Sequence, residues 1–112
     1  MKARDQALLW AAQRISAALL ALCVLVHLVT IIYAVRNGLS AAEILARTRG
    51  SVGWFTFYAT FVLAVSIHAP IGLRSVLMET VAWQGRRLDW TVFVIGIVLA
   101  FLGFRAVWAV FL

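Results

Sequence analysis

Charged residues are scarce in this sequence. Asp, Glu, Lys and Arg make up only 12% of its 112 residues, and just 4 residues are acidic. A soluble domain has roughly a quarter of its residues charged. Hydrophobic residues account for 65% of the chain. This balance excludes an ordinary water-soluble domain and indicates a protein embedded in lipid.

Cysteine and proline each occur once. The lone Cys23 excludes an internal disulfide. Pro70 lies inside an apolar run, where it removes the hydrogen bond that its N–H would have given to the Ser66 carbonyl, so it should kink the helix. The net charge of +6 would suggest nucleic acid in a soluble protein. Here the basic residues flank the apolar stretches, so we expect membrane lipid and no nucleic acid.

Three long apolar stretches cover residues 15–35, 53–73 and 90–112. Each has about 20 residues, the length that an α-helix needs to cross ~30 Å of hydrocarbon. We therefore predict one all-α membrane domain over residues 1–112. Its three transmembrane helices should cover about 8–35, 53–82 and 89–112. A cleaved signal peptide at the start is disfavoured, because the first apolar run is too long and lacks a clear A-x-A site.

The first connection, RNGLSAAEILARTRG, carries a helix stop signal and then a helix start signal. Asn37-Gly38 should end the first helix, and Ser40 with Glu43 forms a capping box. These signals predict a short surface helix over about 41–48. The second connection, WQGRRLD, is tight and basic.

Positive charge predicts the orientation in the membrane, because cytoplasmic loops are enriched in Lys and Arg. The end shared by the N-terminus and the second connection carries Lys2, Arg4, Arg14, Arg74, Arg86 and Arg87. The other end carries Arg36, Arg47 and Arg49, and Arg105 lies within the third helix. This bias favours a cytoplasmic N-terminus in the inner (cytoplasmic) membrane.

Two histidines, His27 and His68, fall in the middle of apolar helices. Such residues are costly in hydrocarbon and usually functional, although each could serve only as an interhelical hydrogen bond. Ala64 and Gly72 lie one turn from His68 on the same stripe and leave room for a flat porphyrin. Arg74 lies about 9 Å further along, within reach of a haem propionate. The pattern favours half of a haem b site, with a proline kink packed through Gly72 as the alternative.

The first helix carries a second polar stripe. It consists of Gln13, Ser16, Leu20, Cys23 and His27. His27 should lie roughly 20 Å above Arg14, and about 10 Å from the depth of His68. The two histidines therefore should not share an iron. Each needs a partner from another polypeptide, or His27 is structural.

The segments QRIS and HAPIGLRSVLME resemble the small membrane-anchor cytochrome b subunits of succinate dehydrogenase and fumarate reductase. That family shows Arg-x-Ser at the start of helix one. In helix two it shows His-x-x-x-Gly-x-Arg followed by an acidic residue, which is Glu79 here. Departures are Ala17 in place of the usual glycine, and Gln13 and Ser75 where many members have histidine.

The resemblance implies a role for each matching residue. His68 would be an axial ligand of haem b, with Gly72 beside the ring, and Arg74 would contact a propionate or the quinone pocket. Arg14 and Ser16 would line the quinone site. His27 would be an axial ligand of a distal haem, as in the dihaem members. The resemblance leaves open whether one haem b or two are bound.

The resemblance implies a membrane anchor and electron-transfer subunit of a succinate:quinone or quinol:fumarate oxidoreductase. It would perform no dicarboxylate chemistry itself. A flavoprotein and an iron–sulfur subunit would dock on its cytoplasmic face, and a second anchor subunit or a second copy of this chain would complete the sites. Quinone would accept or donate the electrons. The alternatives are a haem-free structural anchor and a small transport or pore subunit. The pore is disfavoured, because the third helix offers only Thr91 and Arg105 as polar groups.

Overall fold

The computed structural model describes residues 2–112 and folds them into four helices. These are α1 (Ala3–Arg36), α2 (Ala41–Thr48), α3 (Val52–Thr80) and α4 (Arg86–Phe111). By length and composition, α1, α3 and α4 are long and apolar enough to cross a membrane. The prediction of an all-α protein with three membrane helices and a short surface helix is confirmed. α1 and α4 begin earlier than the predicted residues 8 and 89, because good helix formers extend both helices beyond their apolar runs.

The turn between α1 and α2 follows the local signals. Gly38 takes the left-handed conformation with φ +59°, which a glycine adopts at no steric cost. Its N–H donates to the Val35 carbonyl, and the next N–H, that of Leu39, reaches back to Ala34. The Ser40 hydroxyl then accepts a hydrogen bond from the Glu43 N–H at 3.2 Å. The predicted stop and the predicted cap are both confirmed.

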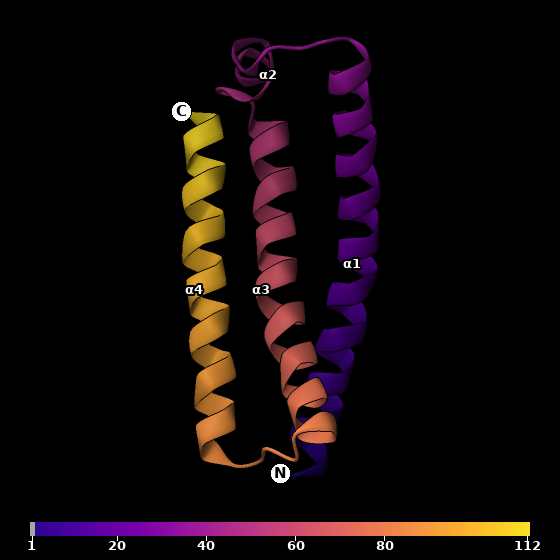
Figure 1. The fold of residues 1–112 in the computed structure, drawn as a ribbon, viewed down its shortest axis with the longest axis vertical. Coiled ribbons are helices and arrows are strands. Elements are labelled where there is room, and N and C mark those ends of the chain that lie inside the picture. The colour runs from indigo at the N-terminus through magenta and orange to yellow at the C-terminus, as the bar shows by residue number, and fades with distance from the viewer. Residues whose placement is uncertain (1) are drawn as a thin grey trace.

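α3 is the central helix of the three that could span the membrane. The other two, α1 and α4, each pack along it, as Figure 1 shows. The N-terminus and the α3–α4 connection lie at one end of the molecule, and α2 and the C-terminus lie at the other. The six cations assigned to the N-terminal side therefore gather at one end. This end is the face predicted to be cytoplasmic.

α3 and α4 approach closely at glycines of α4. A Cβ atom placed on Gly103 would lie 2.5 Å from Val62 Cγ1, and one placed on Gly96 would lie 2.9 Å from Pro70 Cγ. Lipid tails are as apolar as the side chains, so helices in a membrane associate through close packing that small residues permit. The glycines of α4 therefore set its distance from α3.

Pro70 faces α4 and is buried. Pro70 leaves the Ser66 carbonyl without its helical donor. Gly96 of α4 packs beside this carbonyl, since a Cβ atom placed on Gly96 would lie 3.2 Å from the Ser66 oxygen. Figure 1 shows the C-terminal part of α3 leaning away from α4. Proline thus shapes α3 on the side that packs against α4, in addition to bending it near His68.

The end of the molecule that carries α2 is closed by hydrogen bonds to the last turn of α4. The Thr48 hydroxyl donates to the Val110 carbonyl at 2.9 Å, and the Gly50 N–H donates to the Phe111 carbonyl at 2.8 Å. On α2 itself, the Arg47 guanidinium lies 5.2 Å from the centre of the Tyr33 ring of α1. The surface helix is therefore tied to both outer helices.

We predict that Gly103→Ala destabilises the protein. Val62 has a stiff β-branched side chain and cannot move aside easily, so overpacking of about 1–3 kcal/mol should outweigh the ~1 kcal/mol that alanine contributes in a helix. The double variant Val62→Ala/Gly103→Ala should recover most of the loss. The measurement is the Tm of the purified protein in detergent.

Gly53→Ala is the matched control for this prediction, because its added Cβ would meet only Ser51 Oγ at 4.0 Å. Its Tm should be unchanged or higher. A Gly103→Ala protein as stable as Gly53→Ala would contradict the proposed packing role of Gly103.

Candidate functional site

The two polar stripes predicted on separate helices meet along the α1–α3 interface. A Cβ placed on Gly72 would lie 3.2 Å from Gln13 Nε2, and Ser16 Oγ lies 3.4 Å from His68 Nδ1. Near the other end of the interface, His27 Nδ1 lies 3.3 Å from the Tyr58 hydroxyl. The chain thus provides partners for its intramembrane polar groups from the facing helix.

His68 is partly exposed and contacts α1 through one ring nitrogen. The Ser16 side chain that it meets is 3% exposed, and it is the one polar residue classed as buried among residues 2–112. The Ser16 hydroxyl also donates to the Gln13 carbonyl at 3.1 Å. A histidine held at Nδ1 has Nε2 as its remaining ring nitrogen. The site therefore offers one imidazole nitrogen, at Nε2, for a ligand.

His27 lies in an aromatic setting. Its ring makes edge contacts with Tyr58 and Phe61 of α3, at centroid distances of 5.6 and 5.7 Å. Beside it is a cavity of about 600 Å³ between α1, α2 and α3, whose walls include Trp54, Tyr58 and Arg47. This cavity gives His27 the surroundings of a binding site as well as a hydrogen-bond partner.

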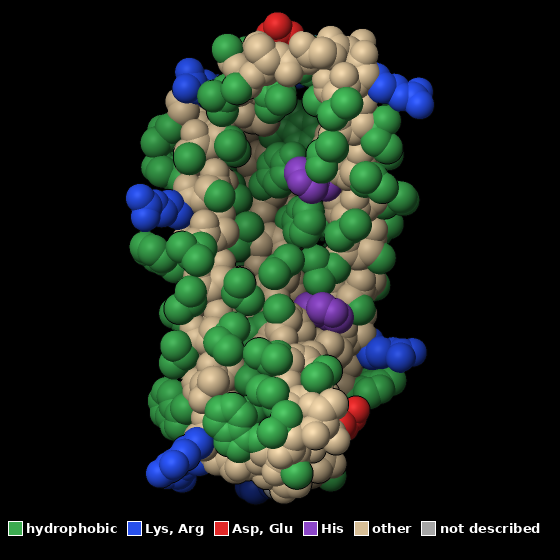
Figure 2. All heavy atoms as spheres, in the orientation of Figure 1, with side chains coloured by type: hydrophobic (Ala, Val, Ile, Leu, Met, Phe, Trp, Pro, Cys, Tyr) green, Lys and Arg blue, Asp and Glu red, His purple; other side chains and the backbone are tan. Residues whose placement is uncertain are grey.

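Both histidine side chains are visible on one face of the molecule, one above the other in the hollow between helices (Figure 2). Ser16 is level with His68, and His27 follows Ser16 by 11 residues on α1. At ~1.5 Å per residue this places His27 about 16 Å away along the helix. The separation supports the expectation that the two rings do not share an iron.

The space beside His68 that Ala64 and Gly72 were expected to leave for a porphyrin is filled within this chain. Gln13 Oε1 is buried and has no hydrogen-bond partner among the described residues. The Gln13 amide covers Gly72, and Ala64 is 3% exposed, so a flat ring could reach Gly72 only by displacing this amide. No group of three or more His, Cys, Asp or Glu side chains gathers within residues 2–112. The site offers one free imidazole nitrogen, His68 Nε2. Haem iron takes one axial ligand on each face of the ring, so His68 could provide one of the two.

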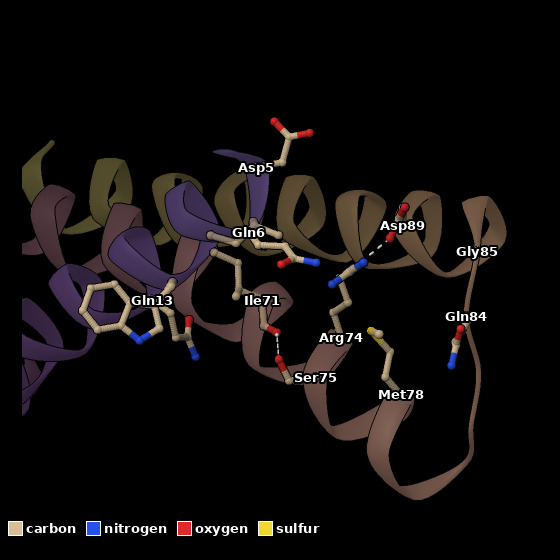
Figure 3. Close-up of a pocket in the computed structure, with 12 residues that line it drawn as sticks. Asp5, Gln6, Gln13, Ile71, Arg74, Ser75, Met78, Gln84, Gly85 and Asp89 are labelled. Carbon is tan, nitrogen blue, oxygen red and sulfur yellow. Dashed lines mark hydrogen bonds and ion pairs between the residues drawn. The ribbon is translucent and has the colours of Figure 1, made fainter. Parts of the chain in front are cut away.

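Arg74 forms an ion pair with Asp89 of α4. Arg74 Nε lies 2.8 Å from Asp89 Oδ1, and the two side chains are 21% and 51% exposed. The pair lies in a cavity of about 790 Å³ at the N-terminal end, shown in Figure 3. The lining residues are Asp5, Gln6, Leu9, Trp10, Gln13, Ile71, Arg74, Ser75, Met78, Gln84, Gly85 and Asp89. Asp89 thus fixes the position of Arg74 within this cavity.

Arg14 and Ser16 point in different directions. Two residues apart on a helix, they are separated by about 200°. Ser16 turns into the α1–α3 interface. Arg14 is exposed and lies over the Trp10 ring, with its Cζ 5.3 Å from the ring centre. Arg14 does not line the cavity itself, but it contacts Trp10, which does. The structure does not bring the two predicted quinone ligands together.

Sequence reasoning gave no role to Tyr58 or Asp89. Tyr58 lies ten residues before His68 on α3, where only the pairing of α1 with α3 puts it at the level of His27. Asp89 could have been found from the tight WQGRRLD turn, because a short turn brings the start of α4 beside the end of α3. Both are contacts between helices, which a pattern within one helix does not reveal.

Comparison with known proteins gives one family. Residues 1–109 match the succinate dehydrogenase/fumarate reductase transmembrane subunit family. No curated protein and no solved structure matches the chain. The match extends over nearly all of the chain and includes all three apolar helices. The chain therefore belongs to the family of succinate dehydrogenase/fumarate reductase transmembrane subunits.

Proposed function

We propose that this chain is the haem-binding membrane anchor of a succinate:quinone or quinol:fumarate oxidoreductase. The dicarboxylate chemistry belongs to partner subunits, and this chain carries electrons between them and a quinone. The observation that supports this most is the His68–Ser16 contact across the α1–α3 interface. It holds one nitrogen of an intramembrane imidazole and leaves the other for a metal.

His68 and Arg74 would hold the haem from this chain. Haem b, when bound, supplies a one-electron redox centre within the membrane. His68 provides an axial nitrogen, for which a neutral imidazole is suited. Arg74 keeps guanidinium N–H groups free beyond its bond to Asp89, and these can donate to a propionate. Gly72 provides space beside His68 that the flexible Gln13 amide can vacate.

Two exposed surfaces of the chain are the proposed docking sites for its partner subunits. A flavoprotein and an iron–sulfur subunit would dock at the basic end, where Arg86 and Arg87 are exposed. Charge at this end supports a cytoplasmic N-terminus in the inner membrane. The histidine-bearing face (Figure 2) would meet a second anchor subunit or a second copy of this chain. That partner would supply the opposite ligand of each iron.

The proposed quinone site is the 790 Å³ cavity at the N-terminal end of the molecule. The cavity combines an indole wall, Trp10, with the Arg74 guanidinium and the Gln13 amide. Arg14 over Trp10 adds positive charge at its rim. A cation and hydrogen-bond donors at this level can stabilise the negative charge that develops on a quinone oxygen during reduction.

A haem-free anchor is the competing function. In that case the histidine–hydroxyl contacts would serve only to hold α1 against α3, as interhelical hydrogen bonds do in membranes. The haem-binding function is favoured because the Ser16 contact engages only Nδ1 of His68, and Nε2 makes no hydrogen bond among residues 2–112.

His68→Ala should remove the haem b bound at His68 (the proximal haem) from the assembled complex, while this subunit still inserts into the membrane. The imidazole is the ligand, and alanine makes the helix more apolar, so insertion is unaffected. The measurement is the b-type absorption spectrum of the purified complex, together with immunodetection of the subunit in membranes. An unchanged spectrum would eliminate His68 as a ligand.

Arg14→Ala should lower quinone-linked turnover severalfold, because it removes the positive charge at the rim of the cavity and an exposed charge contributes up to about 1 kcal/mol. Activity with a water-soluble artificial acceptor should persist, because that electron path avoids the membrane. Arg4→Ala removes an equal charge at the same end and is the control. Equal loss of both activities in Arg14→Ala would instead indicate an assembly defect.

We propose a second, distal haem at His27, supported by the 600 Å³ cavity beside its ring. The wild-type complex should then contain two haems per complex, and the His27→Ala complex should contain one. Pyridine haemochrome analysis against protein concentration gives this ratio. A single haem that is unaffected by His27→Ala would reduce His27 to a structural hydrogen bond with Tyr58.

A further inference from the structure

We propose that Ser16 is a positioning residue that sets the ring tautomer of His68. It places the ring proton on Nδ1 and leaves the lone pair of Nε2 for iron. This inference rests on the proposed role of His68 as an axial ligand. It assigns Ser16 to the orientation of that ligand, whereas the family resemblance points to a quinone contact.

The assignment starts from the position of the Ser16 side chain. It is 3% exposed within the α1–α3 interface, so neither water nor lipid can satisfy its hydroxyl. Its partners among residues 2–112 are the Gln13 carbonyl of its own helix and His68 Nδ1 of α3. A buried hydroxyl with two defined partners has little freedom to rotate.

The tautomer follows from counting hydrogens. A serine hydroxyl has one hydrogen to donate and two lone pairs that accept. The contact from Ser16 Oγ to the Gln13 carbonyl is the shorter one, at 3.1 Å, and a carbonyl can only accept. The hydroxyl hydrogen is therefore committed to Gln13. Toward His68 Nδ1, at 3.4 Å, the oxygen is left to accept, so Nδ1 must carry the proton.

The pair at His27 lacks this constraint. The Tyr58 hydroxyl lies 3.3 Å from His27 Nδ1 and makes no other hydrogen bond within the described part of the chain. It can donate to that nitrogen as well as accept from it. Of the two histidines, only His68 has a partner whose single hydrogen is already engaged. The comparison explains why the positioning role is assigned to Ser16 alone.

A fixed Nδ1–H has two consequences for a ligand at Nε2. It holds the ring in one orientation, and an acceptor at Nδ1–H makes the imidazole a stronger electron donor to the metal. A stronger donor favours the oxidised iron. Loss of the acceptor should therefore raise the midpoint potential of the haem and weaken haem binding, typically about 10-fold or more.

The test uses the assembled complex with Ser16→Ala, Ser16→Thr and Ser16→Cys. Ser16→Ala should shift the midpoint potential of the proximal haem upward and change the EPR signal of its low-spin iron. Ser16→Thr retains the hydroxyl and should restore both. Ser66→Ala is the matched control, because that hydroxyl donates only to the Val62 carbonyl of its own helix, and it should leave both properties unchanged.

The outcomes separate this inference from the proposed function. If His68→Ala loses its haem while Ser16→Ala keeps the wild-type potential and EPR signal, the positioning role is overturned and the haem site stands. If His68→Ala keeps its haem, the proposed ligand itself fails. Should Ser16→Ala not assemble, Ser16→Cys decides: it keeps nearly the same volume with a weaker acceptor, and an unshifted potential overturns the inference.

Discussion

The rest of the structure depends on how two imidazoles are satisfied in hydrocarbon. A polar group in the membrane core has no water to bond, so it must find its partner within the protein. Here the partner of each imidazole is a hydroxyl on the facing helix: Ser16 of α1 for His68, and Tyr58 of α3 for His27. A shift by one residue would rotate one helix by about 100° and break both contacts. These contacts therefore set the register of α1 against α3.

The opposite side of α3 is held by different chemistry. There Gly96 and Gly103 let α4 approach Pro70 and Val62 closely, and the Arg74–Asp89 pair joins α3 and α4 near their connection. Packing of small residues fixes the distance between helices without using polar groups. Tyr58 and His68 are thereby left for the side of α3 that meets α1, and both histidines are visible in Figure 2. The close α3–α4 packing supports the helix that presents the proposed ligand.

The sequence was sufficient for most features governed by local pattern, and it missed the early starts of α1 and α4. Helix number, the Gly38 stop, the Ser40 cap and the surface helix all depend on residues a few positions apart, and all were predicted. The stripe around His68 was also predicted, since a period of 3.6 residues shows which side chains share a face. The same period does not show which helix that face will meet. For that reason the Gln13 amide over Gly72 and the Tyr58 hydroxyl beside His27 emerged only from the structure.

The most direct test of this account is an electron cryo-microscopy map of the assembled complex that resolves side chains around His68. We expect a haem whose iron is bonded to His68 Nε2, with the Ser16 hydroxyl at Nδ1 and the ion pair between Arg74 and Asp89 intact. A map without haem at His68, or with iron bonded to Nδ1 and Ser16 turned elsewhere, would contradict it.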